Sequence, residues 1–232
     1  MRISRYIFTS SLLLLLPFIA IAQETKTEEK EGLFAFKGVS VGADLFGYMS
    51  TVFNEYSSGE FGVSVNLGNR FFPTVEIGYG STDHTDELTQ IYYKSSAPYY
   101  RVGLDYNFLH KKKGKLSGYK IFAIGRYGWT SPKYSLKTAP IIDPVWGSSS
   151  TLEVNNAKSS CAWFEIGAGI QVRVWKNLHM GWSIRYKTRL KDEKGNQSQI
   201  WYIPGYGENK SSNFGGTYTI IYDLPIGKKN NE

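Results

Sequence analysis

The sequence predicts an all-β fold, namely an eight-stranded antiparallel up-and-down transmembrane β-barrel with short periplasmic turns and long extracellular loops. Three observations predict it. A secretory signal opens the chain, apolar and polar residues alternate with a period of two in eight segments, and long and short connections alternate strictly. Strands of membrane barrels show this pattern because neighbouring side chains face lipid and lumen in turn.

The first 22 residues have the parts of a secretory signal peptide. Arg2 and Arg5 give a basic start, an apolar run follows, and Ala20-Ile21-Ala22 forms a small-x-small cleavage site before Gln23. The run is short for a retained transmembrane helix. The predicted segments are a signal peptide over 1–22, a flexible periplasmic leader over 23–36, the outer-membrane barrel over 37–225 and a periplasmic tail over 226–232.

The composition of the mature chain excludes several classes of protein. No second long apolar stretch follows the signal, so helices cannot carry the chain across a bilayer. Cys161 is the only cysteine, which excludes an internal disulfide. Loss of Arg2 and Arg5 with the signal lowers the formal net charge from +7 to +5, and the excess is spread along the chain, so we expect no nucleic-acid partner.

Eight segments carry the strand pattern, and seven connections separate them. Two of the connections are tight turns that contain Asn69 and Asn177, and we expect these asparagines to take the left-handed conformation that such turns need. The expected strands are 39–45, 61–67, 75–79, 100–108, 119–130, 164–174, 178–186 and 217–224. The expected connections are 48–59, 68–70, 81–96, 110–118, 131–158, 175–177 and 189–213.

The polar face of these strands carries charges of both signs interleaved with glycines, which predicts that it lines the lumen. An eight-stranded barrel is only wide enough to be filled by side chains, and buried charges must be paired. If Val174 faces Leu178, Glu165 lies opposite Lys187 and diagonal to Arg185. The predicted lumen charge network comprises Asp44, Glu76, Arg101, Asp105, Arg126, Glu165, Arg173, Arg185 and Lys187, with Asp223 on the same face.

Aromatic residues on the apolar face fall near the strand ends, as expected for girdles at the two membrane interfaces. They are Tyr79, Tyr100, Trp129 and Tyr186 toward one end, and Phe108 and Tyr222 toward the other.

Several motifs resemble an uncharacterised family of outer-membrane β-barrel proteins, a domain of unknown function. They include Asn66-Leu-Gly-Asn-Arg-Phe-Phe-Pro73, Val75-Glu-Ile-Gly-Tyr-Gly80, Asp143-Pro-Val-Trp-Gly147 and Phe214-Gly-Gly-Thr-Tyr218. The resemblance covers nearly the whole mature chain. It implies the fold and the location in the outer membrane, and it implies no chemistry.

Two constellations could carry chemistry, but a plainer interpretation of each is preferred. Asp83-His84-Thr85-Asp86-Glu87 offers metal-ligand types without zinc or calcium-loop spacing, and we interpret it as a solvated acidic loop. His179, Ser183 and Glu165 could form a catalytic set, but His179 falls near the periplasmic end, and interior packing explains it better. We therefore expect no metal, no cofactor and no enzymatic activity.

Two outer loops are too apolar for idle solvent loops, so they either fold over the barrel mouth or form a partner surface. The function predicted from them is a non-catalytic outer-membrane barrel that contacts lipid and recruits an outer-membrane or surface protein. A narrower form of this prediction is that the barrel is an accessory subunit of a larger outer-membrane complex. The alternatives are a narrow channel or transporter, and, less favoured, a lipid-modifying barrel enzyme. The candidate partner residues are Ile141, Trp146, Trp201, Tyr202 and Tyr206.

Overall fold

The computed structural model describes residues 32–45, 47, 56–110, 118–142, 147, 149–190 and 200–224. The predicted signal peptide, most of the leader, the lysine-rich turn after His110 and the C-terminal tail lie outside the described residues. Contacts divide the chain between Leu33 and Phe34, and only the second unit is considered below. No helix among the described residues is long and apolar enough to cross a membrane.

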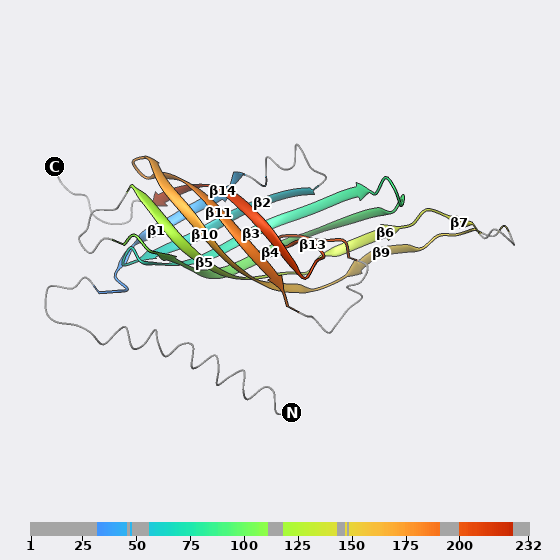
Figure 1. Ribbon diagram of the computed structural model, residues 1–232, viewed down its shortest axis with the longest axis horizontal. Coiled ribbons are helices and arrows are strands. Elements are labelled where there is room, and N and C mark those ends of the chain that lie inside the picture. Colours follow the sequence, from blue (N-terminus) through green and yellow to red (C-terminus); the bar gives the residue numbers. More distant parts are fainter. Residues whose placement is uncertain are drawn as a thin grey trace, which may run out of the picture. The chain divides into compact units, whose positions relative to one another are not determined.

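Eight long strands form a closed antiparallel barrel, as predicted (Figure 1). Each strand pairs with the next long strand along the chain, and the last returns to the first, where Val41 lies opposite Tyr222. The barrel strands are β1 (Phe36–Asp44), β2 (Tyr56–Leu67), β3 (Phe71–Thr85), β4 (Tyr92–Asn107), β5 (Tyr119–Thr130), β10 (Cys161–Trp175), β11 (Leu178–Arg189) and β14 (Ser212–Leu224).

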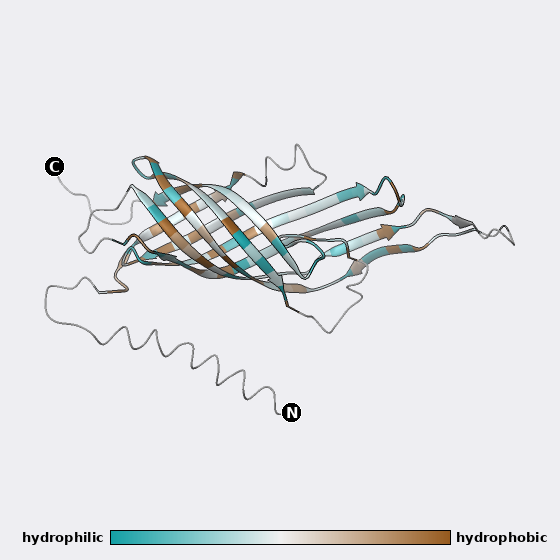
Figure 2. Cartoon of the chain, in the orientation of Figure 1, coloured by the Kyte–Doolittle hydropathy of each residue, from teal (hydrophilic) through white to brown (hydrophobic). Residues whose placement is uncertain are grey.

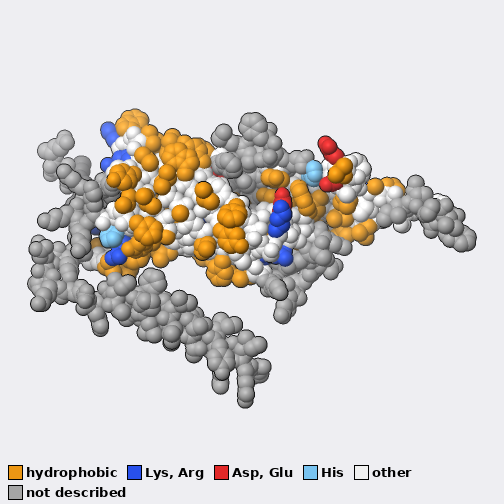
Figure 3. All heavy atoms as spheres, viewed as in Figure 1, with side chains coloured by type: hydrophobic (Ala, Val, Ile, Leu, Met, Phe, Trp, Pro, Cys, Tyr) orange, Lys and Arg blue, Asp and Glu red, His pale blue; other side chains and the backbone are white. Residues whose placement is uncertain are grey.

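The barrel is apolar outside and polar inside, which identifies it as a transmembrane barrel. In β3, Val75, Ile77 and Tyr79 are exposed, whereas the alternate positions Thr74 and Glu76 are buried. Figure 3 shows apolar side chains spread over the barrel wall, and Figure 2 shows hydrophobic and hydrophilic positions following one another along the strands. A soluble barrel of this size would place the apolar face inside, where it could be buried from water.

The aromatic residues predicted for the interfacial girdles all face outward on the barrel wall. Tyr79, Tyr100, Trp129 and Tyr186 are each more than a third exposed, and so are the two at the other end. Tyr100 stacks on Trp129 from the neighbouring strand, with ring centroids 5.6 Å apart. This pair marks one edge of the apolar band.

The short turns lie where the sequence predicts them, with one correction. Asn69 has φ +58°, the expected left-handed conformation. In the second turn, Lys176 has the positive φ (+29°), whereas the prediction assigned this role to Asn177. Asn177 instead donates a side-chain hydrogen bond to the carbonyl of Asp223 (2.9 Å), which ties the turn to the neighbouring strand.

Two segments predicted as loops, 81–96 and 131–158, are largely strand, and this prediction is wrong. β3 and β4 continue past the apolar band, and β6 (Lys133–Lys137) and β9 (Glu153–Lys158) extend the same sheet. We call the part formed by 81–85, 92–96, β6 and β9 the external sheet; it projects from one end of the barrel and leads to the short strands β7 (Ile141–Ile142) and β8 (Ser149–Ser150) (Figure 1). Lysine and serine residues lie on the outer face of the external sheet, so its strands lack the apolar–polar alternation by which the sequence predicts strands.

Candidate functional site

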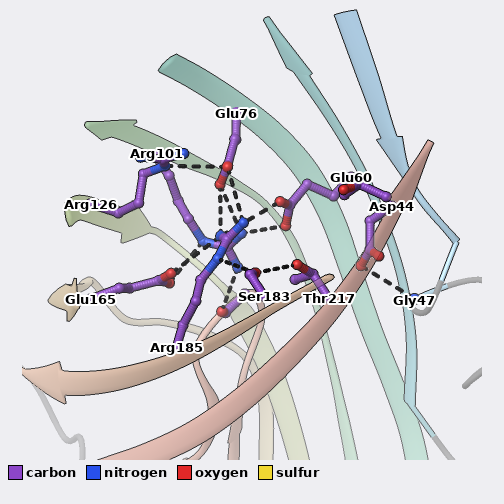
Figure 4. A network of polar contacts seen from close by, with 12 residues as sticks. Asp44, Gly47, Glu60, Glu76, Arg101, Arg126, Glu165, Ser183, Arg185 and Thr217 are labelled. Atoms are coloured by element: carbon purple, nitrogen blue, oxygen red, sulfur yellow. Dashed lines mark hydrogen bonds and ion pairs between the residues drawn. The ribbon is translucent and has the colours of Figure 1, made fainter. Parts of the chain in front are cut away.

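The lumen contains a cluster of buried acidic and basic side chains, drawn in Figure 4. We call it the lumen cluster. Its members project inward from six strands, and their side chains are at most 16% exposed. The acids are Glu60, Glu76, Asp105 and Glu165, and the bases are Arg101, Arg126 and Arg185.

Glu76 is the centre of the lumen cluster because three arginines contact its carboxylate. Its Oε2 lies 3.0 Å from Nη1 of Arg185 and 3.2 Å from Nη1 of Arg101. Its Oε1 lies 3.3 Å from Nε of Arg126. An unpaired carboxylate at this depth would be strongly unfavourable, so these contacts are what allow Glu76 to be buried while charged.

Arg101 and Arg126 connect the centre to the other acids. Arg126 holds Asp105 through two parallel hydrogen bonds of 2.5 and 2.9 Å, the fork geometry that guanidinium groups favour. Arg101 pairs with Glu60, and its Nε lies 2.9 Å from Oε1 of Glu165 without the alignment of a hydrogen bond. The indole of Trp163 donates a hydrogen bond of 2.6 Å to Glu165. The contacts therefore run from wall to wall across the lumen.

The structure brings six of the nine predicted lumen charges into this cluster: Glu76, Arg101, Asp105, Arg126, Glu165 and Arg185. Lys187 faces inward opposite Glu165, as predicted, but its Nζ donates to the carbonyl of Gly205 (2.7 Å). The premise for that register is wrong, since Trp175, not Val174, lies opposite Leu178 and a bulge absorbs the difference.

Two predicted lumen charges, Asp44 and Arg173, are not part of the cluster, and one member of the cluster, Glu60, was not predicted. Asp44 is buried but accepts backbone N–H groups of Tyr218 (3.0 Å) and Gly47 (3.4 Å). Arg173 forms no ion pair with the lumen cluster. Glu60 was missed because β2 begins at Tyr56, earlier than expected. The signal was available, since Glu60 continues the inward series of Gly62 and Ser64.

A segment from Ile200 to Ser211 folds into the external mouth of the barrel, and we call it the plug. It contains the small strands β12 (Tyr202–Ile203) and β13 (Gly207–Glu208). Its apolar residues pack in one core cluster with aromatic residues of the barrel wall and the external sheet. That core comprises Ile200, Tyr202, Ile203, Tyr206, Tyr93, Tyr99, Tyr134, Cys161 and Trp163.

The burial of the plug corrects the interpretation of Tyr202 and Tyr206 as partner-facing residues. They are 7% and 1% exposed, and burial raises the pKa of Tyr202 to about 12. Trp201 is 38% exposed and stacks on His84, with ring centroids 5.2 Å apart. The side chains of Ile141 and Trp146 lie outside the described residues.

Gly205 joins the plug to the lumen cluster. Its carbonyl accepts hydrogen bonds from Arg101 (3.0 Å) and Lys187 (2.7 Å). Its φ of +81° favours glycine, and a Cβ built there would lie 2.5 Å from the ring of Tyr99. The plug can therefore seat on the cluster only with glycine at this position.

Beyond the lumen cluster, the lumen contains a cavity of about 120 Å³. Five members of the lumen cluster form part of its lining, and neutral polar and apolar side chains complete it. The five are Glu60, Glu76, Asp105, Arg126 and Arg185, and the others include Ser64, Thr74, Gln171, Thr219, Phe72 and Phe122. A cavity needs about 10–15 Å³ to hold one water, and each water fills about 30 Å³ in the liquid, so this cavity has room for several waters. It is much smaller than a porin channel.

The residues considered for catalysis and metal binding are not assembled into such sites. His179 contacts Asp223 (2.9 Å), whereas Ser183 contacts Thr217 (2.6 Å), so no serine–histidine–carboxylate relay forms from them. In the predicted acidic loop, Asp83 pairs with Lys94 (2.8 Å) and Asp86 accepts the N–H groups of the turn that follows it. Among the described residues, no group of three or more potential ligands could hold a metal ion.

Several solved outer-membrane proteins resemble the chain in fold. A major outer membrane protein from Thermus thermophilus has a TM-score of 0.50 and 10% identity, covering 80% of this chain and 98% of that one. Neisserial surface protein A has a TM-score of 0.41 and 14% identity, covering 82% and 99%. The attachment invasion locus protein Ail of Yersinia pestis has a TM-score of 0.39 and 10% identity, covering 80% and 95%.

Sequence comparison gives a family without an assigned activity. No curated protein matches the chain at a significant level. The family model described as "Domain of unknown function (DUF6048)" matches residues 3–229, nearly the full length. The chain belongs to this family.

Proposed function

We propose that the protein is an integral outer-membrane barrel that is closed to diffusion and recruits a protein partner through its external sheet. The observation that carries this proposal is the contrast between lumen and exterior. The lumen is occupied by mutually paired charges and by the plug, whereas β3, β4, β6 and β9 extend outward well past the apolar band. The barrel thus anchors the protein in the outer membrane, and the external sheet is the surface that contacts the partner.

The external hairpins carry exposed apolar side chains that the barrel does not need. Leu88, at the end of the β3–β4 hairpin, is 96% exposed, and Leu152, beside β9, is 51% exposed. Both lie outside the apolar band, so lipid does not cover them. Exposed apolar side chains on such a projection favour a protein interface.

The orientation of the barrel is tested by labelling whole cells with a membrane-impermeant thiol reagent. In a Cys161→Ala background, Leu88→Cys is expected to react, because the external sheet faces outward. Lys176→Cys, in the tight turn at the other end, is expected to stay unlabelled until the outer membrane is opened. The opposite pattern would invert the proposed orientation, and labelling of both in a soluble fraction would end the membrane assignment.

The partner proposal is tested by shortening the external hairpin that runs from β6 through β7 and β8 to β9. Thr138 and the backbone of Leu152 close it through two hydrogen bonds of 3.0 Å, so replacement of 139–151 by a short Gly/Ser linker should preserve the sheet below. The variant also carries Leu88→Ser and Leu152→Ser, which remove the two exposed leucines. We expect the variant to remain a heat-modifiable barrel and to lose its main copurifying protein after mild crosslinking in cells. Lys176→Ser is the control and should retain that protein. Unchanged copurification by the shortened variant would contradict the proposal.

The cavity is the one feature that favours the second candidate, a narrow gated channel. A channel would require the plug and the lumen cluster both to move, since both lie across the lumen. Electrical measurements on the Gly205 variant described in the Discussion separate the two functions.

A further inference from the structure

We propose that the outer face of the barrel, at the base of the external sheet, binds the phosphate groups of a lipid headgroup in the outer leaflet. This rests on the membrane orientation proposed above and goes beyond the partner interface. We call the surface the serine–lysine patch. It comprises Ser81, Ser96, Ser131, Lys94, Lys133 and Lys158.

The position of the patch follows from strand geometry. On β4, the outward series runs from Tyr100 through Pro98 and Ser96 to Lys94, and on β5 and β6 it runs from Trp129 through Ser131 to Lys133. Lys133 is four strand residues past Trp129, about 13 Å before tilt is considered, and Lys94 is six past Tyr100, about 20 Å. Lysines at these distances past the aromatic girdle reach the headgroup layer, while the girdle remains at the hydrocarbon edge. In Figure 3, charged side chains lie between the barrel wall and the external sheet.

The lysines are arranged to share one anion. Lys133 and Lys158 are directly opposite each other on β6 and β9, so their Cβ atoms lie about 4.5–5.5 Å apart. Neither forms an ion pair with any acid in the described part of the chain. Like charges placed opposite each other destabilise a sheet, and a phosphate between them would remove that repulsion.

The neighbouring side chains add donors suited to the same ligand. Ser96 is opposite Lys133, and it therefore places a hydroxyl beside the lysine pair. Lys94 contacts Asp83 at 2.8 Å, but both side chains are more than half exposed, so water and salt screen this pair and Lys94 can turn toward an anion. Serine side chains are small, and they leave room for a headgroup between the girdle and the lysines.

A lipid fits this surface better than a soluble anion does. Tyr100 and Trp129 are each 37% exposed and stack on each other directly below the patch. An acyl chain can lie against these rings while its headgroup phosphate meets the lysines. A free anion would use the lysines alone and would gain nothing from contact with these rings.

The test measures binding of purified mature protein in detergent micelles to diphosphorylated lipid A, to its dephosphorylated form and to inorganic phosphate. The double variant Lys133→Gln/Lys158→Gln should bind diphosphorylated lipid A about thirtyfold more weakly than wild type, since each lysine near a membrane surface contributes about a fivefold factor. Lys137→Gln is the matched control on the same sheet face and should bind as wild type does.

Wild type should also bind the dephosphorylated lipid at least tenfold more weakly than the diphosphorylated one. Equal binding by the double variant and Lys137→Gln, or equal binding to the two lipids, would overturn the proposal. Binding of inorganic phosphate as tight as that of the lipid would show a site for soluble anions and would also overturn it. Heat-modifiability on gels verifies folding, and Lys158→Gln alone, with an expected fivefold loss, replaces the double variant if that variant does not fold. Because the measurement uses purified protein, its failure leaves the partner and labelling experiments unaffected.

Discussion

Glu76→Gln is expected to lower the free energy of unfolding by about 3–5 kcal/mol, the typical cost of breaking a buried ion pair from one side. Three arginines contact this carboxylate, and the side chains of all three are at most 6% exposed. The glutamine has nearly the same shape, so the loss reflects charge rather than volume. Urea titration of the folded barrel in detergent, followed by tryptophan fluorescence, measures it.

Glu153→Gln is the matched control for this change. Glu153 is exposed on β9 and hydrogen bonds only to Asn155 among the described contacts, so its variant should stay within about 0.5 kcal/mol of wild type. A double variant of Glu76→Gln with Arg185→Met should recover part of the loss, because it removes a cation that the first change deprives of its nearest carboxylate. Equal losses from Glu76→Gln and Glu153→Gln, or strictly additive losses in the double variant, would show that the lumen cluster is not coupled as described.

Gly205→Ala is expected to expel the plug from the barrel mouth. The new methyl group would overlap the ring of Tyr99, and it would also place a side chain at φ +81°. Arg101 and Lys187 both donate hydrogen bonds to the carbonyl of Gly205, so a displacement of this residue should break both bonds together. Protease added to whole cells should cleave the variant within 200–211 and leave wild type intact over the same time.

Gly207→Ala separates backbone strain from the clash. Gly207 also lies in the plug and has a positive φ (+113°), but a Cβ there lies 3.4 Å from Nδ2 of Asn213, an ordinary contact distance. This control should therefore show no new cleavage within 200–211. If both variants are cleaved equally in that segment, contact with Tyr99 does not hold the plug.

The Gly205→Ala variant also distinguishes a closed barrel from a channel. In planar bilayers we expect no stable conductance of porin size from wild type or from Gly205→Ala, because the lumen cluster still crosses the barrel. A conductance that appears only in Gly205→Ala would make the plug a gate and would favour the channel.

The sequence by itself determined the barrel wall. Period-two alternation assigns each strand residue to one face, and a one-residue slip would expose a whole apolar set to the lumen. For this reason Glu165 is found opposite Lys187 even though a bulge near Trp175 invalidates the turn from which that register was argued. The same parity brings six predicted charges into the lumen cluster, because inward positions of neighbouring strands must share a narrow interior.

Only the tertiary structure decided what the long connections do. The apolar residues of 200–206 were equally compatible with a partner surface and with a lid, since local sequence does not say which apolar surface a loop will meet. The outcome depends on contacts between distant parts of the chain, such as Arg101 with the carbonyl of Gly205, and on the space that Tyr99 leaves beside that glycine. The external sheet was hidden for a related reason. Its strands pair outside the membrane, where the outer face contacts water rather than lipid. Lysine and serine therefore occupy outward positions that are apolar in the membrane-spanning part of the strands.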